Sequence, residues 1–227
     1  MLLPERRILP PPHPAERLRQ DRLKRALDVT VATVLLILAA FLMAVLALLV
    51  LVAHGRPVLF RQCRAGLAGR PFQLLKFRTM RAPDPVRGLV SDADRLTRLG
   101  RWLRATSLDE LPSLVNVLRG EMSLVGPRPL LDHYLSRYSE RQARRHEVRP
   151  GITGLAQVRG RNALSWEEKF EYDVWYVDHR CLRLDLSILV ATARTVLLRE
   201  GISAEGVATA PEFVGARALT AVDGGRR

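Results

Sequence analysis

The sequence has little cysteine and no cysteine-rich pattern. Cys63 and Cys181 are the two cysteines among 227 residues, and neither lies in a CxxC or mixed Cys/His spacing. Disulfide-stapled domains and structural zinc sites both need several such residues at short, recurring intervals. The sequence therefore indicates neither, and a reducing compartment is the natural environment for this chain.

Acidic residues are also comparatively few. The chain carries 36 Lys and Arg against 23 Asp and Glu, which leaves a formal net charge of +13. An excess of this size favours an anionic partner: a nucleic acid, a phosphorylated molecule such as a nucleotide sugar, or an anionic lipid surface. No recognised nucleic-acid-binding motif is present, and nucleic-acid binding would not explain residues 29–53.

Charge is absent altogether from residues 29–53. As a helix, this run of 25 residues would be about 37 Å long, which is enough to cross a bilayer. The run starts well inside the chain and no small-residue cleavage site follows it, so we expect a permanent anchor rather than a signal peptide. A buried core helix is the alternative, although such helices are rarely so uniformly apolar.

Both flanks of the run are basic. Positive charge marks the cytoplasmic side of a membrane helix, so a helix that enters and leaves by the same face would satisfy both flanks and hold them against anionic lipid headgroups. Such a bend normally needs Pro or Gly, and the run has neither, only Ala39 and Ala40 near its middle. A straight spanning helix therefore stays open as the alternative. The basic residues are Arg17, Arg19, Arg22, Lys24 and Arg25 upstream, and Arg56, Arg61, Arg64, Arg70, Lys76 and Arg78 downstream.

The rest of the sequence predicts an α+β fold that is mostly helical. Two strand-like segments, 58–62 and 72–78, are separated by a glycine-containing stretch and predict a small β-hairpin. Apolar residues at helical spacing predict several helices, the last of them amphipathic and suited either to a core or to a membrane surface. The predicted helices are 94–104, 108–119, 132–147, 166–177 and 184–198, and the predicted loops are 81–93 and 151–162.

Two adjacent carboxylates are candidate catalytic residues. Ser107 followed three residues later by Glu110 is a capping-box pattern, which predicts that Asp109 and Glu110 lie in the first turn of a helix, where backbone N–H groups attract anions. In the structural interpretation Glu110 caps the helix and Asp109 favours its dipole. In the catalytic interpretation Asp109 attacks a phosphorus atom and Glu110 helps to hold Mg²⁺, the ion expected for a phosphate substrate.

Two basic motifs are candidate phosphate ligands. In GPRP at 126–129 the prolines restrict the backbone on both sides of Arg128 and predict an oriented, bidentate guanidinium. Lys76 and Arg78 alternate along a predicted strand and therefore share one face. Taken one at a time, each motif is equally consistent with a solvated arginine or a solvated strand face.

The remaining conspicuous residues are interpreted as structural. The glycine-bearing loop at 149–157 matches neither a P-loop nor a dinucleotide fingerprint, so a structural turn is its default interpretation. The aromatic and acidic helix at 166–176 and three isolated histidines are assigned to packing and to the surface. These histidines are His133, His146 and His179.

Four ordered motifs together resemble the bacterial sugar transferases of the monotopic phosphoglycosyl transferase type. They are KRALD at 24–28, KFRTM at 76–80, SLDELPSLVNVLRGEMSLVGPRP at 107–129 and VRPGITGLAQVRGRN at 148–162. The similarity runs from about residue 24 to residue 206, and the four motifs in this order are specific where each alone is not. The chain is expected to be the minimal catalytic unit, without the additional N-terminal membrane helices of larger relatives.

The resemblance implies a Mg²⁺-dependent transfer of a sugar 1-phosphate from a UDP-sugar to undecaprenyl phosphate, with release of UMP. It places this reaction on the cytoplasmic face of the bacterial inner membrane, as the first membrane step of surface glycan or glycoprotein assembly. It makes Asp109 the nucleophile that forms a covalent phosphosugar intermediate, and assigns Glu110, with Asp109, to the metal. The residues expected to bind substrate are Lys76, Arg78, Arg104, Pro127, Arg128 and Pro129.

Two features refine the resemblance. In close relatives a Ser-Pro pair breaks the membrane helix into a re-entrant hairpin, whereas Ala40 and Phe41 occupy that place here, so the re-entrant topology implied by the family lacks its usual helix breaker. The stretch at 160–166 is most similar to the subgroup that acts on UDP-N,N'-diacetylbacillosamine or other N-acetylated sugars.

The expected organisation has four parts. Residues 1–16 form a mobile proline-rich arm, 17–55 a membrane-inserted helix with basic flanks, 56–206 the cytoplasmic catalytic domain and 207–227 a C-terminal tail. The expected partners are a UDP-sugar, undecaprenyl phosphate and anionic lipids, with no nucleic acid and no indication of the oligomeric state. A non-catalytic protein that binds membrane surfaces through its basic faces is the alternative.

Overall fold

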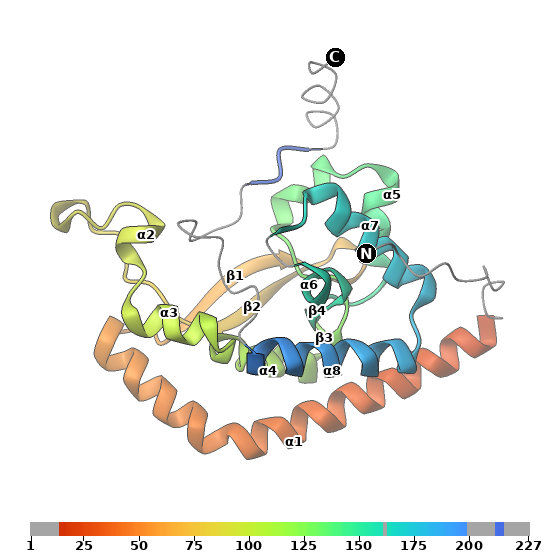
Figure 1. The fold of residues 1–227 in the computed structure, drawn as a ribbon, viewed down its shortest axis with the longest axis horizontal. Coiled ribbons are helices and arrows are strands. Elements are labelled where there is room, and N and C mark those ends of the chain that lie inside the picture. The colour runs from red at the N-terminus through yellow and green to blue at the C-terminus, as the bar shows by residue number, and fades with distance from the viewer. Residues whose placement is uncertain (1–13, 161–162, 199–211, 216–227) are drawn as a thin grey trace, which may run out of the picture.

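The computed structural model describes residues 14–160, 163–198 and 212–215. Within them the chain is mostly helical, with one long N-terminal apolar helix and a small two-stranded sheet, which confirms the predicted α+β class. In Figure 1 the long helix α1 runs beneath a domain that contains the β-hairpin and the shorter helices. Residues 1–13 of the expected arm, and most of the expected C-terminal tail, lie outside the described residues.

Helix α1 spans Pro14–His54 and is therefore longer than its apolar run. Proline is well tolerated in the first turn of a helix, because the N–H it lacks has no partner within the helix. Residues 18–54 form a helix long and apolar enough to cross a membrane. Its most apolar window of 18 residues has a mean hydropathy of 3.3, and only 11% of that window is buried against the protein. This helix associates the protein with a membrane.

Helix α1 bends, so that two arms pack on the same domain (Figure 1). Ala32 in the first arm belongs to the main hydrophobic core, whereas Leu46 and Val50 in the second arm belong to a separate core. Between these contacts the side chain of Phe41 is 82% exposed. The helix therefore bends without Pro or Gly, and its exposed apolar middle lies between two packed arms.

Both ends of α1 are also tied to the domain by hydrogen bonds. Near the start, the guanidinium of Arg25 donates to the carbonyl oxygen of Val117 at 2.6 Å. At the end, the His54 ring lies 2.8 Å from the Thr97 hydroxyl, and Arg78 donates to the His54 carbonyl oxygen at 2.6 Å. A cation at a helix C-terminus satisfies carbonyls that have no partner within the helix.

A buried polar cluster anchors the first arm. The Asp28 carboxylate accepts hydrogen bonds from the Ser123 hydroxyl at 2.8 Å and from the Leu124 N–H at 3.2 Å. Lys24, one turn earlier, donates to Asp185 at 2.6 Å. Because Asp28 and Asp185 are almost fully buried, these partners are what makes their burial tolerable.

Two small sheets organise the domain. Strands β1 (Leu59–Ala65) and β2 (Pro71–Phe77) form the predicted antiparallel hairpin, with Leu59 opposite Phe77. The single turn η1 (Leu67–Gly69) joins them. Strands β3 (Ser123–Val125) and β4 (Gly151–Thr153) pair in parallel and were not predicted, because three residues are too few to show a strand pattern.

The predicted helices are confirmed in part. Helices α4 (Ser113–Arg119), α7 (Trp166–His179) and α8 (Leu182–Leu198) follow the predicted periodicity. The segment 94–104 was predicted as one helix but contains the end of α2 (Asp92–Arg95) and most of α3 (Arg98–Ala105), since Thr97 caps a new helix there. In the loop predicted at 81–93 lies the single turn η2 (Pro85–Arg87).

Two sequence predictions were wrong. Residues 132–147 are not one helix but three short pieces, η4 (Asp132–Arg137), α5 (Glu140–Ala143) and η5 (Arg144–Glu147). Ser139 caps the N-terminus of α5, so a new helix begins there. In addition, the segment has no continuous apolar stripe that would hold one long helix against the core. The loop predicted at 151–162 contains β4 and α6 (Leu155–Arg159), and its residues 161 and 162 lie outside the described part.

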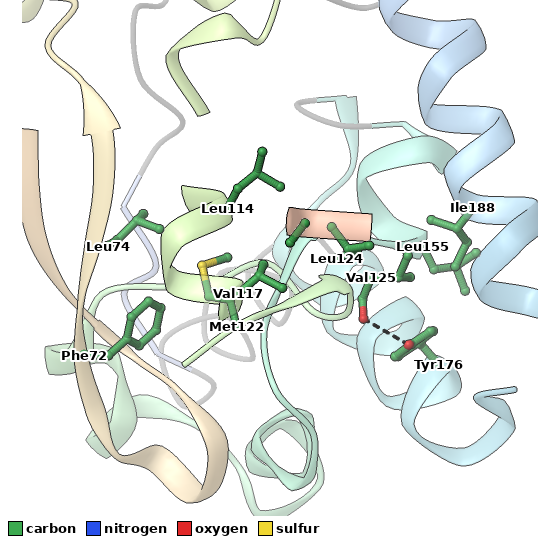
Figure 2. Packing of buried hydrophobic residues seen from close by; sticks show 11 residues of the cluster. Phe72, Leu74, Leu114, Val117, Met122, Leu124, Val125, Leu155, Tyr176 and Ile188 are labelled. Atoms are coloured by element: carbon green, nitrogen blue, oxygen red, sulfur yellow. Dashed lines mark hydrogen bonds between the residues drawn. The ribbon is translucent and has the colours of Figure 1, made fainter. Parts of the chain in front are cut away.

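The main core lies between the hairpin, α4, β3 and α8. Figure 2 shows Tyr176 of α7 directing its hydroxyl to the Val125 carbonyl oxygen, at 3.1 Å. A third cluster, which is aromatic, joins η4 and α7 to residues 212–215 of the C-terminal part, where Phe213 is completely buried. The labelled residues of the main core are Phe72, Leu74, Leu114, Val117, Met122, Leu124, Val125, Leu155, Tyr176 and Ile188.

Candidate active site

Asp109 and Glu110 lie in a single helical turn, η3 (Leu108–Glu110), between α3 and α4. The preceding Ser107 has a left-handed backbone, with φ of 57°, and its side chain makes no capping hydrogen bond. The predicted capping box is therefore wrong. A capping box does not form because Ser107 lacks the extended backbone of an N-cap residue. The Glu110 carboxylate, moreover, pairs with Lys76 and Arg128 and not with the Ser107 N–H.

The Glu110 carboxylate collects two cations from distant segments. Oε1 accepts from the Lys76 ammonium at 2.5 Å and from the Arg128 guanidinium at 3.3 Å. Burial opposes ionisation of Glu110, but the charges of Lys76 and Arg128 outweigh it and lower the pKa of this carboxyl. Glu110 is therefore an anion that holds β2 and the GPRP turn against η3.

The neighbouring Asp109 has the opposite character. Its side chain is nearly buried, and burial raises its pKa to about 6, although the charge of Lys76 acts in the other direction. The charge of Glu110 adds to the increase. At neutral pH Asp109 is thus ionised but poorly solvated, which is the state that favours attack by a carboxylate nucleophile.

The turn that carries Arg128 is held by its backbone. Arg145 is buried and donates to the Arg128 carbonyl oxygen at 2.7 Å, while its other donors bind Asp173 of α7 at 2.7 and 3.0 Å. Arg64 of β1 donates to the Pro129 carbonyl oxygen at 3.2 Å. The Arg128 side chain is consequently presented from a fixed frame.

Close approach of two loops completes this frame. The Gly126 N–H donates to the Thr153 carbonyl oxygen, and the Gly151 N–H donates to the Pro127 carbonyl oxygen, both at 2.9 Å. A Cβ atom at Gly126 would lie 2.4 Å from the Arg149 carbonyl oxygen, which is too close for any side chain. The glycines of the loop at 149–157 therefore serve the packing of the GPRP turn, as the structural interpretation predicts.

The structure places the other predicted binding residues in two ways. Arg104 donates from Nε to the Thr79 hydroxyl at 3.1 Å, and the charges of Asp109 and Asp92 act on its guanidinium. It therefore belongs to the surroundings of Asp109. Arg78 instead donates to the backbone carbonyls of Met80, Pro57 and His54.

A groove lies beside Arg78, at the C-terminal end of α1. Its volume is about 600 Å³, and Arg61 and Arg78 supply its charge among apolar residues. A substrate-binding role for Arg78 stays a prediction, because its donors hold the end of α1 rather than the carboxylate pair.

The residues present are compatible with Mg²⁺ only in combination with substrate. No group of three or more His, Cys, Asp or Glu side chains arranged to hold a metal occurs among the described residues. Mg²⁺, however, is commonly bound by one or two carboxylates together with substrate phosphates. Asp109 and Glu110 supply such a pair, and a diphosphate would supply the remaining oxygens.

Sequence reasoning missed the residues that support the turn. Arg145 lies in a run of basic residues within the predicted helix at 132–147, and Asp173 lies on the helix at 166–176, which was assigned to packing and to the surface. Both are buried and bonded to each other. Nothing in a one-dimensional charge pattern distinguishes a buried arginine from its solvated neighbours, so only the fold identifies them.

Comparison with known proteins gives a consistent result. The model of the family described as "Bacterial sugar transferase" matches residues 19–199. An uncharacterized sugar transferase, EpsL, of Bacillus subtilis (strain 168) is 54% identical over 194 residues, which cover 85% of this chain and 96% of the relative.

Two further relatives have names that describe a reaction. A UDP-glucose:undecaprenyl-phosphate glucose-1-phosphate transferase of Caulobacter vibrioides is 45% identical over 202 residues, 83% of this chain and 75% of the relative. An undecaprenyl-phosphate galactose phosphotransferase of Salmonella typhimurium is 39% identical over 197 residues, 79% of this chain and 41% of the relative.

Proposed function

Because the chain belongs to the bacterial sugar transferase family, we propose that it transfers a sugar 1-phosphate from a UDP-sugar to undecaprenyl phosphate and releases UMP. It is an enzyme of the polyprenyl-phosphate phosphoglycosyl transferase class. The observation that carries the proposal is the pairing of a nearly buried carboxylate, Asp109, with an ionised neighbour, Glu110, that gathers Lys76 and Arg128.

In the first step a carboxylate oxygen of Asp109 attacks the sugar-linked phosphorus of the UDP-sugar. An acyl phosphate bond forms, the bond from that phosphorus to the bridging oxygen breaks, and UMP leaves with the electron pair. Arg128 and Lys76 lie where negative charge on the diphosphate needs cationic partners. Because Asp109 is poorly hydrated, little solvent has to be removed before it attacks.

In the second step a phosphate oxygen of undecaprenyl phosphate attacks the same phosphorus. The acyl phosphate bond breaks, Asp109 is restored as a carboxylate, and the product is an undecaprenyl diphosphate sugar. No proton has to be removed from either nucleophile, since both are already anionic. Two displacements replace one difficult direct transfer, as is typical of covalent catalysis.

Mg²⁺ is proposed as the cofactor. When bound by Glu110 and Asp109 together with the diphosphate, it would neutralise phosphate charge and stabilise the departing UMP. Glu110 is suited to this role because the charges of Lys76 and Arg128 keep it ionised. Arg128 and Lys76 already orient the same carboxylate in this structure.

We place the bend of α1 in the cytoplasmic leaflet of the bacterial inner membrane. Support comes from the two ends of the helix, which both bind the same domain, and from the exposed apolar residues between them. A helix fixed in this way enters and leaves by one face, with the basic flanks against anionic lipid headgroups. The active site then lies at the membrane surface, where undecaprenyl phosphate presents its headgroup.

For the sugar we propose an N-acetylated hexose derivative, such as N,N'-diacetylbacillosamine. The sequence at 160–166 supports this choice, although the named relatives act on glucose or galactose. A panel of UDP-sugars, with release of UMP as the readout, decides it. The product would serve as the first lipid-linked intermediate of surface glycan or glycoprotein assembly.

The decisive experiment uses Asp109→Asn in full-length protein with a UDP-sugar and undecaprenyl phosphate. The wild type should release UMP and, without the lipid, should gain the mass of a sugar phosphate on the peptide that contains residue 109. The variant should do neither while it still sediments with membranes. Equal turnover by the variant would refute the nucleophile, and a wild type that binds anionic vesicles without turnover would favour the non-catalytic alternative.

A further inference from the structure

Lysine is rare in this basic chain. Of 36 cationic residues, 33 are arginines and the lysines are Lys24, Lys76 and Lys169. Two of them have specific partners, because Lys24 binds Asp185 and Lys76 binds Glu110, each within hydrogen-bond distance. The third, Lys169, lies on α7, in the segment assigned from the sequence to packing and to the surface, and its surroundings point to another role.

The fold carries Lys169 to the side of the active site formed by Arg128. Asp173 lies one turn further along α7, and residues four apart share a helix face. Asp173 binds Arg145, and Arg145 donates to the Arg128 carbonyl oxygen at 2.7 Å. The face of α7 that carries Lys169 is thus connected to the turn that presents Arg128, and the charge of Arg128 acts on the Lys169 ammonium.

A rigid aromatic ring positions Lys169. Its ammonium lies 4.8 Å from the centre of the Trp166 ring, a favourable cation–π geometry. The ring itself stacks on Phe170 at 5.7 Å and contacts Phe213 at 5.6 Å, so the aromatic cluster holds it in place. Lys169 is therefore half-buried and oriented, unlike a lysine on a solvated surface.

Two cations are thus held on the same side of the site. Within the described residues no carboxylate lies within salt-bridge distance of Lys169. Among the same residues the single carboxylate bound by Arg128 is that of Glu110, which also forms a salt bridge with Lys76. Like charges brought together by a rigid frame repel each other unless an anion lies between them.

On the premise of the proposed function, we infer that Lys169 and Arg128 form a two-cation subsite for a substrate phosphate group. That group belongs either to the diphosphate of the UDP-sugar or to the phosphate of the lipid. Lys76 and Arg104 lie at the carboxylates. Lys169, which lies over the Trp166 ring, would add a further cation on the side of Arg128.

The test compares Lys169→Met with the wild type in full-length enzyme. Methionine keeps an unbranched stem over Trp166 but removes the charge. KM is measured separately for the UDP-sugar and for undecaprenyl phosphate, with release of UMP as the readout. Loss of one charge-assisted contact should raise KM about tenfold, while Lys169→Arg should retain most of the affinity. A rise for the UDP-sugar assigns the subsite to the diphosphate, a rise for the lipid assigns it to the lipid phosphate, and a rise for both shows that they use it in turn.

Arg141→Met is the matched control, because it also removes one positive charge beside α7, where Arg141 pairs with Glu171 at the exposed surface. It should leave both KM values unchanged. The inference fails if Lys169→Met leaves both KM values at the wild-type level, whether or not kcat changes. Should that variant not fold, Lys169→Gln serves the same comparison. A wild type that releases no UMP would refute the proposed function instead, so the two failures are distinguishable.

Discussion

At the residue scale, Asp109 and Glu110 are neighbours with opposite electrostatic environments. Burial raises the pKa of Asp109, whereas the charges of Lys76 and Arg128 overcome burial at Glu110 and lower its pKa. Adjacent carboxyl groups whose pKa values are driven apart commonly divide the work of a site. In the mechanism that we propose, this division makes Asp109 the reactive group and Glu110 the fixed anion.

The pH dependence of the first step should follow Asp109. Because its pKa is raised to about 6, the carboxylate form predominates above that pH and is progressively lost below it. We expect kcat/KM for the UDP-sugar to fall about tenfold for each unit below the midpoint, since this parameter reports ionisation of the free enzyme. The diphosphate of the UDP-sugar does not titrate in this range.

The control for this profile is Lys76→Met. The charge of Lys76 lowers the pKa of Asp109, so its removal should move the midpoint to higher pH. The measurement is the pH profile of UMP release over the stable range of each protein. A midpoint that stays in place in this variant would show that another group controls the rate.

At the element scale, the GPRP turn depends on contact between two backbones. Gly126→Ala would bring a Cβ atom within 2.4 Å of the Arg149 carbonyl oxygen, and neither partner is a flexible side chain. We expect turnover to fall about a hundredfold, because a displacement of about 1 Å at a positioning element can have that effect. Steady-state release of UMP, with circular dichroism to verify folding, is the measurement.

Gly88→Ala separates this packing effect from ordinary backbone strain. Gly88 has a φ of 70° but no atom within 4 Å of its hypothetical Cβ, and it follows the η2 turn. Alanine there should cost about 1–2 kcal/mol of stability from the left-handed backbone and leave turnover unchanged. If Gly126→Ala behaves in the same way, the close contact is not what positions Arg128.

Helix α1 depends on its buried polar anchor. Asp28→Ala would leave the Leu124 N–H without its partner and the Ser123 hydroxyl with the Val125 carbonyl oxygen alone. We expect a loss of about 3 kcal/mol, because groups left unpaired in a buried network are not resolvated. At this chain length that loss lowers Tm by roughly 6–12 °C, measured by thermal unfolding in detergent.

Asp21→Ala is the comparison on the same helix. Asp21 pairs with Arg180, but its side chain is 46% exposed. Water replaces the lost partner, so the cost should be below about 1 kcal/mol. Equal changes in Tm for the two variants would show that Asp28 is not a special anchor.

At the scale of the whole molecule, the two ends of α1 bind one domain, and this arrangement supports the re-entrant topology that we propose. Single cysteines near residues 5 and 225, introduced after Cys63 and Cys181 are replaced by serine, should both be protected from a membrane-impermeant reagent added outside intact cells. Labelling of the first position alone would establish a spanning helix. Permeabilised cells, in which both positions should react, provide the control.

The sequence by itself determined the parts that depend on local pattern. An uninterrupted apolar run specifies the membrane helix, alternation specifies the hairpin, and helical periodicity specifies α4, α7 and α8. The order of the motifs led to the family, which the family model and the relatives then showed. It also drew attention to Asp109 and Glu110.

Only the tertiary structure decided how these parts meet. It replaced the predicted capping box by ion pairs of Glu110 with Lys76 and Arg128, and it bent α1 without a helix breaker. It also separated one buried arginine, Arg145, from a run of basic residues. The physical reason is that burial and long-range pairing arise between segments far apart in the chain, and they determine both the charge state of a side chain and the direction in which it points.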